Sequence, residues 1–320
     1  MKACLRLRPS SSLSGTLLAL PLLAVLLPAR AAPRTAETPG AGPVRRVLRL
    51  ATGAVETVPL EAYVAAVLPA EIGGNAPAAA LEAQAVAARS YALARRERHA
   101  EQGADLCDGV HCQVYEGLSR ATAATRRAAE ATRGLVLVQK GRVIAAPFHA
   151  VCGGRTALPS AVWDDEETPD LAPVEDDACL ASEGARWSFF LPRAQLPPLA
   201  SRLGFPEARF LEVWAHGEDG RVAALRLVAP GGRALVVRGF DARARASEIW
   251  GWSSLRSTDF EVAARPQGWV FTGRGTGHGA GLCQAGAIAR ARRGERRDAI
   301  LAHYYRGAVT APLDAARTSR

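Results

Sequence analysis

The sequence has few aromatic residues and almost no lysine. Aromatic residues make up 6% of its 320 positions, and Lys2 and Lys140 are the only lysines. Surfaces that bind nucleic acid combine clustered basic residues with aromatic side chains on which bases stack. No run of this kind is present, so we do not expect a nucleic-acid partner.

Long apolar runs are also missing. A membrane helix needs roughly 18 consecutive apolar residues, and the best candidate is the shorter run 17–27. Three basic residues precede this run, and a small-x-small signal, Ala29-Arg30-Ala31, follows it. This pattern predicts a secretory signal peptide over residues 1–31. We therefore expect an exported protein of the periplasm or cell envelope, with no membrane span after cleavage.

The remaining chain divides by composition. Loss of residues 1–31 lowers the net charge from +9 to +5, so the mature chain is only mildly basic. Residues 32–44 are rich in Ala, Pro and Gly and are expected to form a flexible leader. Residues 45–310 are expected to fold as the main domain, with a subdivision near residue 134 as an alternative, and residues 311–320 to form a C-terminal tail.

Apolar periodicity predicts helices and strands without regular alternation. This favours an α+β fold in which a helical N-terminal part packs on a mostly antiparallel β part, with a cleft between them. Residues 152–186 show little periodicity and are expected to form a long surface excursion. The predicted helices are 60–72, 77–98, 119–133, 282–292 and 296–305, and the predicted strands are 45–51, 135–138, 142–151, 187–191, 209–215, 222–229 and 234–238.

Glu71 lies on the apolar side of the first predicted helix. On a helical wheel it falls beside Val64 and Val67, whereas Glu61 falls off this stripe and is expected to be an ordinary solvated residue. A carboxyl group among apolar neighbours has a raised pKa and can hold a proton for donation. The alternative is that Glu71 reaches water at a frayed helix end beside Gly73.

The segment 272–284 contains five glycines within ten residues. It matches neither a phosphate-binding loop nor a dinucleotide-binding fingerprint. His278 lies in its centre and is predicted either to bind substrate or assist proton transfer, or to donate to a backbone carbonyl and hold the loop.

Five cysteines remain after the signal peptide, so they cannot all pair within the chain. Cys107 and Cys112 lie in the sequence Cys-Asp-Gly-Val-His-Cys, which brings two thiols and an imidazole within six residues. This mixture suits a tetrahedral zinc site. A Cys107–Cys112 disulfide is the alternative in an oxidising compartment.

Taken together, six ordered blocks resemble the SpoIID/LytB family, the stage II sporulation protein D group, over roughly residues 45–310. The blocks are Pro59-Leu-Glu-Ala-Tyr-Val with Pro69-Ala-Glu71-Ile, Ala83-Gln84-Ala-Val-Ala-Ala-Arg89-Ser-Tyr91-Ala, Cys107-Asp-Gly-Val-His111-Cys112-Gln113-Val-Tyr115, Thr132-Arg-Gly134-Leu, Cys152-Gly-Gly-Arg-Thr156, and Gly277-His278-Gly-Ala-Gly-Leu-Cys283-Gln284 followed by His303-Tyr304-Tyr305.

The resemblance implies a lytic transglycosylase that cleaves peptidoglycan glycan strands, preferably strands stripped of stem peptides. It implies that Glu71 protonates the glycosidic oxygen between N-acetylmuramic acid and N-acetylglucosamine, and then accepts the proton of the muramic 6-hydroxyl, which leaves a 1,6-anhydro end. His278 is the second expected catalytic residue. The residues expected to bind substrate are Gln84, Arg89, Gly277, Gly279 and Gln284.

The resemblance also implies a structural or site-supporting zinc ion. Cys107 and Cys112 are the expected thiolate ligands, with His99 as a third ligand and His111 as its competitor. Cys152 and Cys179 are then candidates for a disulfide, with Cys283 free.

Two residues depart from the family pattern: Ala285 stands where an aromatic residue is common, and Ile72 replaces the usual Met. The alternatives to a lytic enzyme are a non-catalytic module that binds glycan or enhances a cell-wall amidase, and a zinc amidase.

Overall fold

The computed structural model describes residues 42–95, 98–163 and 168–316. The expected signal peptide and the leader up to residue 41 lie outside the described residues. None of the helices in the described ranges combines the length and apolar character that crossing a bilayer requires.

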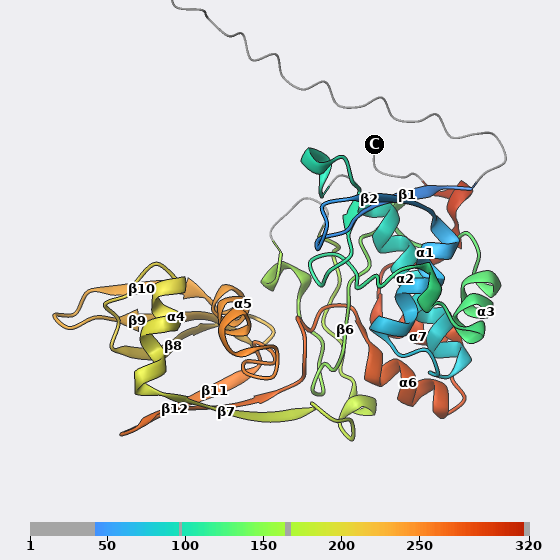
Figure 1. Ribbon diagram of the computed structural model, residues 1–320. Coiled ribbons are helices and arrows are strands. Elements are labelled where there is room, and N and C mark those ends of the chain that lie inside the picture. The colour runs from blue at the N-terminus through green and yellow to red at the C-terminus, as the bar shows by residue number, and fades with distance from the viewer. Residues whose placement is uncertain (1–41, 96–97, 164–167, 317–320) are drawn as a thin grey trace, which may run out of the picture. The chain divides into compact units, whose positions relative to one another are not determined.

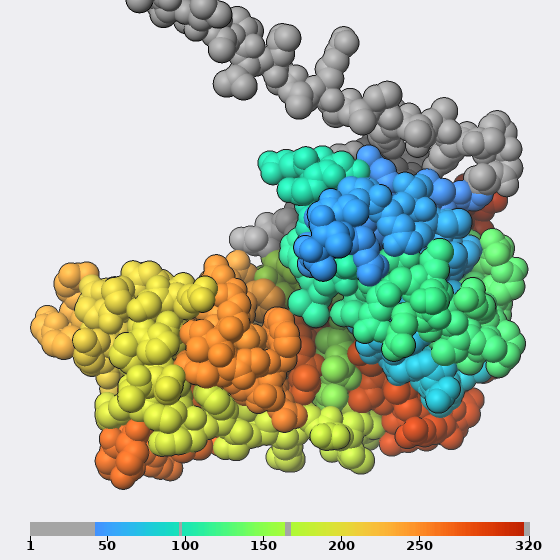
Figure 2. Space-filling view, in the orientation of Figure 1, coloured from blue at the N-terminus to red at the C-terminus, as the bar shows by residue number. Residues whose placement is uncertain are grey.

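Five helices form the first of two large hydrophobic cores. The chain of α2 consists largely of alanine, and small side chains let neighbouring helices approach closely. Figure 2 shows the red surface of α6 directly against the cyan surface of α2, two segments far apart in sequence. The helices are α1 (Leu60–Glu71), α2 (Ala78–Ala94), α3 (Ala123–Ala131), α6 (Gln284–Arg292) and α7 (Arg297–Tyr304).

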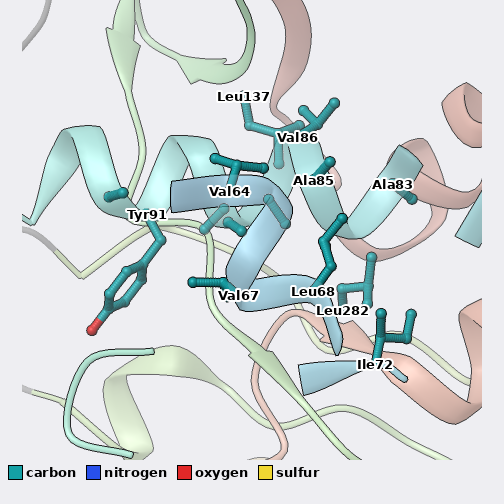
Figure 3. Packing of buried hydrophobic residues seen from close by; sticks show 14 of the residues in the cluster. Val64, Val67, Leu68, Ile72, Ala83, Ala85, Val86, Tyr91, Leu137 and Leu282 are labelled. Carbon is teal, nitrogen blue, oxygen red and sulfur yellow. The ribbon is translucent and has the colours of Figure 1, made fainter. Parts of the chain in front are cut away.

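The apolar stripe of α1 packs on α2, as Figure 3 shows. Val64, Val67 and Leu68 are completely buried. The view also places Leu137 and Leu282 in this cluster, so strands β4 (Leu135–Gln139) and β13 (Leu282–Cys283) contribute to the same core. The helix that carries Glu71 is therefore fixed along most of its length.

Short sheets complete this part of the fold. Strands β1 (Val44–Leu48), β2 (Val55–Pro59) and β3 (Leu106–Cys107) form one sheet in the order β2-β1-β3. A second sheet contains β14 (Val309–Pro312), β4 (Leu135–Gln139) and β5 (Arg142–Val143) in that order, and β6 (Phe148–His149) pairs in parallel with β13 (Leu282–Cys283).

The second core lies between residues 187 and 271 and is built on two antiparallel three-stranded sheets. Trp269 and Phe271 are completely buried within it. Figure 1 shows these strands with α4 and α5 in yellow and orange. The sheets are β7 (Arg186–Pro192), β11 (Phe260–Arg265) and β12 (Gly268–Arg274), and β8 (Phe210–His216), β9 (Val222–Val228) and β10 (Ala234–Arg238); the helices are α4 (Leu196–Arg202) and α5 (Gly239–Trp250).

Short 3₁₀ helices lie in the connections. They are η1 (Ala100–Gln102), η2 (Leu118–Arg120), η3 (Pro159–Ala161), η4 (Asp177–Cys179), η5 (Arg193–Gln195) and η6 (Leu313–Ala315).

The α+β class and most of the predicted strands are confirmed, but several boundaries differ. The strand predicted over 142–151 is wrong as a continuous element, because only β5 and β6 are strands within it, and β6 pairs in parallel with β13. The helix predicted from Ser119 begins later, because Thr122 caps α3 in a reciprocal pair of hydrogen bonds with Thr125. The predictions did not include α4, α5, β11 or β12, although β12 is a completely regular strand.

The long-range organisation also differs from the expectation. The cores do not divide at residue 134, because α6 and α7 return to the first core. The segment 152–186 is not only a surface excursion, because Asp176 and Cys179 are completely buried. The expected tail from residue 311 starts inside β14, which pairs with β4.

Candidate functional site

Glu71 is the last residue of α1, and its side chain is partly buried. The backbone N–H of Val114 donates to its Oε1 at 2.7 Å. Burial raises the pKa of Glu71 above its usual value, and the hydrogen bond from Val114 offsets part of this rise. The surroundings therefore favour the protonated carboxyl group, as a general acid requires.

Two glutamine side chains, one of them beside Glu71, have free hydrogen-bonding capacity within the described residues. The amide of Gln284, at the start of α6, lies close enough to Glu71 to lower its pKa, yet its Nε2 has no hydrogen-bond partner among the described residues. Gln84 in α2 is completely buried, and both polar atoms of its amide lack a partner there as well. Buried amides without partners are suited to bind water or a ligand.

Four potential metal ligands converge near the end of α2. His111 Nδ1 lies 3.3 Å from His99 Nε2, 3.7 Å from Cys112 Sγ and 3.9 Å from Cys107 Sγ. Cys112 Sγ lies 3.6 Å from His99 Nε2. All four ligand atoms are within 4.8 Å of one another. His111 and His99 thus join the cluster together rather than compete for one position.

These separations match a tetrahedral zinc site. Zinc bonds of about 2.3 Å to sulfur and about 2.0–2.1 Å to nitrogen place two nitrogens about 3.4 Å apart and a sulfur and a nitrogen about 3.6 Å apart. Both cysteines are free thiols in the structure. A hydrogen bond from Cys112 and a weaker one from His111 hold the pKa of Cys107 well below its usual value, which supplies one thiolate.

A short stretch of chain connects this cluster to Glu71. Cys112 is followed by Gln113, which accepts a hydrogen bond from the Tyr63 hydroxyl at 3.0 Å and donates to the backbone of α2. The next residue, Val114, is the one that donates to Glu71. A candidate metal ligand, Cys112, thus lies two residues before the backbone donor that holds the carboxyl group.

His278 has different surroundings. Its Nδ1 accepts the N–H of Ala280 at 3.1 Å, and its ring packs against Trp163 and His149 at centroid distances of 4.8 and 5.6 Å. Burial, with His149 and Arg243 nearby, lowers its pKa well below the usual value. The ring is therefore neutral, and no hydrogen bond or ring contact in the described parts of the chain connects it to Glu71.

The glycines beside His278 make room for other parts of the protein. Gly279 has a φ of +86°, and a Cβ there would lie 2.8 Å from the guanidinium carbon of Arg221. A Cβ on Gly277 would lie 3.0 Å from the Cβ of His149. Close internal packing, rather than the approach of a sugar, accounts for glycine at both positions.

Arg89 is completely buried and holds helices together. It forms a bidentate ion pair with Glu61, with N···O distances of 2.9 and 2.6 Å, and donates to the backbone oxygens of Ala129 and Leu135. The expectation that Glu61 is an ordinary solvated residue is wrong, because its carboxylate is the partner of this buried cation. These internal contacts give Arg89 a structural role and leave it no surface for a substrate.

Two cavities are found away from Glu71. They are lined by residues between 153 and 274, among them Arg155, Arg186 and Asp259, and neither is lined by Glu71 or His278. The cleft expected at Glu71 therefore stays a prediction. The residues that sequence reasoning missed are Val114, a backbone donor that no side-chain pattern reveals, and Asp176, the buried acid of a cysteine cluster considered below.

Comparison with known proteins relates these features to a family of similar proteins. The model of the stage II sporulation protein (SpoIID) family matches residues 49–139, which include α1, Glu71 and the Cys/His cluster. The chain is 29% identical to stage II sporulation protein D of Bacillus subtilis over 304 residues, which cover 89% of this chain and 84% of that protein.

Two further relatives extend the comparison. An uncharacterized protein of Brachyspira hyodysenteriae is 29% identical over 79% of this chain and 67% of its own length. The amidase enhancer of Bacillus subtilis is 27% identical over 75% of this chain, but only 39% of the enhancer is covered. The family match around Glu71 and the similarity along most of the chain make this protein similar to the stage II sporulation protein D family.

Proposed function

We propose that this protein is an exported lytic transglycosylase that acts on peptidoglycan glycan strands. The observation that carries the proposal is the position of Glu71, a carboxyl group with a raised pKa at a helix end. Val114 holds it, and the Gln284 amide, whose Nε2 has no partner among the described residues, faces it. Similarity to the SpoIID family supports a role in cell-wall metabolism.

In this reaction Glu71 acts twice. As an acid it donates its proton to the glycosidic oxygen, and as a carboxylate it then accepts the proton of the muramic 6-hydroxyl group while that oxygen attacks the anomeric carbon. A single carboxyl group is sufficient, unlike in ordinary glycosidases, which use two. The Val114 N–H stabilises the carboxylate formed between these steps, and Gln284, which lies beside Glu71, is the candidate to hydrogen-bond the sugar, whereas Gln84 is completely buried, like Arg89.

The Cys/His cluster has a supporting role in this proposal. His99, Cys107, His111 and Cys112 would hold a zinc ion, which would fix the loop that carries Val114. With all four residues as ligands, a tetrahedral zinc ion would have no open position for a water nucleophile, so this set suits a structural ion better than a hydrolytic one. His278 positions the glycine-rich loop through its bond to Ala280.

The test is incubation of the purified protein with denuded glycan strands, followed by mass spectrometry of the ends. Lytic cleavage gives 1,6-anhydro-muramic ends, whereas hydrolysis gives reducing ends. Glu71→Gln should give no cleavage, and Glu116→Gln, which changes an exposed carboxylate, should cleave like the unaltered protein. Reducing ends, or intact strands with the unaltered protein, would contradict the proposal.

The second candidate function is enhancement of a cell-wall amidase without cleavage of glycan. The similarity to an amidase enhancer favours it. It predicts intact glycan strands in the same assay, together with faster release of stem peptides when a cell-wall amidase is added. Such enhancement should persist in Glu71→Gln, because no proton transfer is involved.

A further inference from the structure

A second group of potential metal ligands lies in the interior, separate from the Cys/His cluster. It comprises Cys152, Asp176, Cys179 and Cys283, whose ligand atoms lie within 4.8 Å of one another. All four residues are completely buried. We propose that these residues bind a second metal ion of the zinc type, through three thiolates and one carboxylate.

The donor set agrees with such an ion. Soft thiolates with one carboxylate suit zinc and related transition metals. Cys152 Sγ lies 3.5 Å from Asp176 Oδ2, close to the S–O separation of about 3.6 Å in a tetrahedral zinc site. The Sγ atoms of Cys152 and Cys179 lie 3.2 Å apart, which is less than the separation of roughly 3.8 Å between two sulfur ligands of such a site. These two sulfurs would therefore move apart when an ion binds.

Backbone donors surround the sulfur atoms. Cys283 Sγ accepts the N–H of Cys152 at 3.3 Å and that of Gly286 at 3.4 Å, the latter at the start of α6. The Cys179 sulfur faces the N–H groups of Gly153 and Gly154. Amide donors of this kind stabilise negative sulfur, and they are the outer contacts that metal-bound thiolates require.

The carboxylate is held in the same way. Asp176 Oδ2 accepts the hydroxyl of Tyr304 at 2.7 Å, and Oδ1 is 3.4 Å from Arg290 Nη2. A Cβ at Gly286 would meet both Asp176 Oδ2 and the Tyr304 hydroxyl at 2.1 Å. The glycine in α6 therefore makes room for this carboxylate, which indicates a built site rather than a chance approach of polar groups.

The location suggests what the second ion does. Cys283 precedes Gln284, whose amide faces Glu71, just as Cys112 lies two residues before Val114, the other contact of that carboxyl group. Each segment that contacts Glu71 is thus adjacent to a cysteine of a different cluster. A second ion would fix the Gln284 side of the site as the first would fix the Val114 side.

The alternative state of this cluster binds no metal and contains a Cys152–Cys179 disulfide instead. Its formation would release two protons and transfer two electrons to a thiol–disulfide oxidant of the exported compartment. It would leave Cys283 without a partner and would not use Asp176. Metal analysis and cysteine connectivity separate the two states without an activity measurement.

The experiment measures the metal bound to the mature chain, which lacks the expected signal peptide. The protein is purified without reductant or chelator and dialysed against limiting zinc. We expect about two zinc ions per chain, one per cluster. Cys283→Ser keeps a side chain that can cap α6 but removes a thiolate, and Cys112→Ser does the same at the other cluster. Each variant should retain about one ion per chain, and the double variant should retain none.

Cysteine connectivity provides a measurement that needs no variant. The unaltered protein is unfolded in an alkylating agent without reductant and then digested. The proposal predicts that Cys152, Cys179 and Cys283 are all alkylated. About one zinc per chain, unchanged by Cys283→Ser, or a Cys152–Cys179 cross-linked peptide, would overturn it.

Discussion

Glu71 and His278 are both titratable residues in suggestive motifs, but the protein surrounds them differently. Glu71 is partly buried, accepts one backbone N–H and faces the Gln284 amide, whose Nε2 has no partner in the described part of the chain. His278 packs between two rings and accepts a backbone N–H, near two arginines. Burial disfavours the charged form of each. The result is a carboxyl group whose pKa is raised, which favours its protonated form, and an imidazole whose pKa is lowered, which favours its neutral form.

The comparison teaches that a motif identifies a residue but not its protonation state. Burial raises the pKa of Glu71 and makes it suited to act as an acid. Burial lowers the pKa of His278 and leaves it a neutral residue of the scaffold. The difference between the two residues also predicts two kinds of mutational effect. Loss of Glu71 should affect the reaction and not the fold, whereas loss of His278 should affect both.

The largest expected effect is that of Glu71→Gln. Glutamine preserves the shape and can still accept the Val114 N–H, but it cannot donate a proton, so cleavage of denuded strands should fall by roughly a thousandfold or more. Turnover measured by mass spectrometry of anhydro ends checks this, with glycan binding and the melting temperature as controls for folding. Near-normal turnover in the folded variant would remove Glu71 from the reaction.

Loss of the Cys/His cluster should have the next largest effect. Cys112→Ser or treatment with a chelator should lower turnover about 10- to 100-fold and lower the melting temperature as well, because the loop that holds Val114 loses its anchor. Metal analysis with a thermal melt tests both changes. A chelated protein that melts unchanged but no longer cleaves would move the ion into the reaction itself.

His278→Ala should lower stability and activity in parallel. The variant leaves the N–H of Ala280 without its acceptor and opens space between two rings, which should reduce the free energy of unfolding by about 1–3 kcal/mol. His278→Asn should restore part of this loss, because its Oδ1 can accept the same N–H. If activity falls a hundredfold with an unchanged melting temperature, and asparagine gives no recovery, His278 acts in the reaction and the contrast with Glu71 fails.

The pH profile offers a smaller but direct measure of the Glu71 environment. Because burial raises the pKa of Glu71, the alkaline limb of kcat/KM should lie above the usual pKa of a glutamate. Substitution of Gln284 by Leu removes the amide that lowers this pKa, so the limb should shift further to high pH. A limb at the ordinary glutamate value would show that the carboxyl group is solvated.

The smallest expected effect is on stability. The pKa of Glu71 is higher in the folded than in the unfolded chain, so the folded chain binds this proton more tightly. Stability therefore falls as the pH rises through the unfolded pKa, and the loss is complete above the folded pKa. Glu71→Gln should melt like the unaltered protein in acid and about one to a few degrees higher near neutral pH. A lower melting point at neutral pH would contradict the raised pKa.

Local patterns predicted much of this molecule. The apolar stripe that fixes α1, the antiparallel strands between 187 and 238 and the closing helices follow from periodicity, which depends only on near neighbours. Spacing within six residues was enough to group Cys107, His111 and Cys112. The Glu61–Arg89 ion pair was missed because its partners lie 28 positions apart on different helices.

The sequence by itself determined which groups are available: one carboxyl group on an apolar helix face, a cluster of soft ligands and a histidine among glycines. Only the tertiary structure decided how each is used. It placed Val114 against Glu71, packed Arg221 into the space left by Gly279, and brought Asp176 to three cysteines spread from residue 152 to 283. The reason is physical: pKa values and ligand sets depend on contacts between distant segments, and these form only when the two cores are packed.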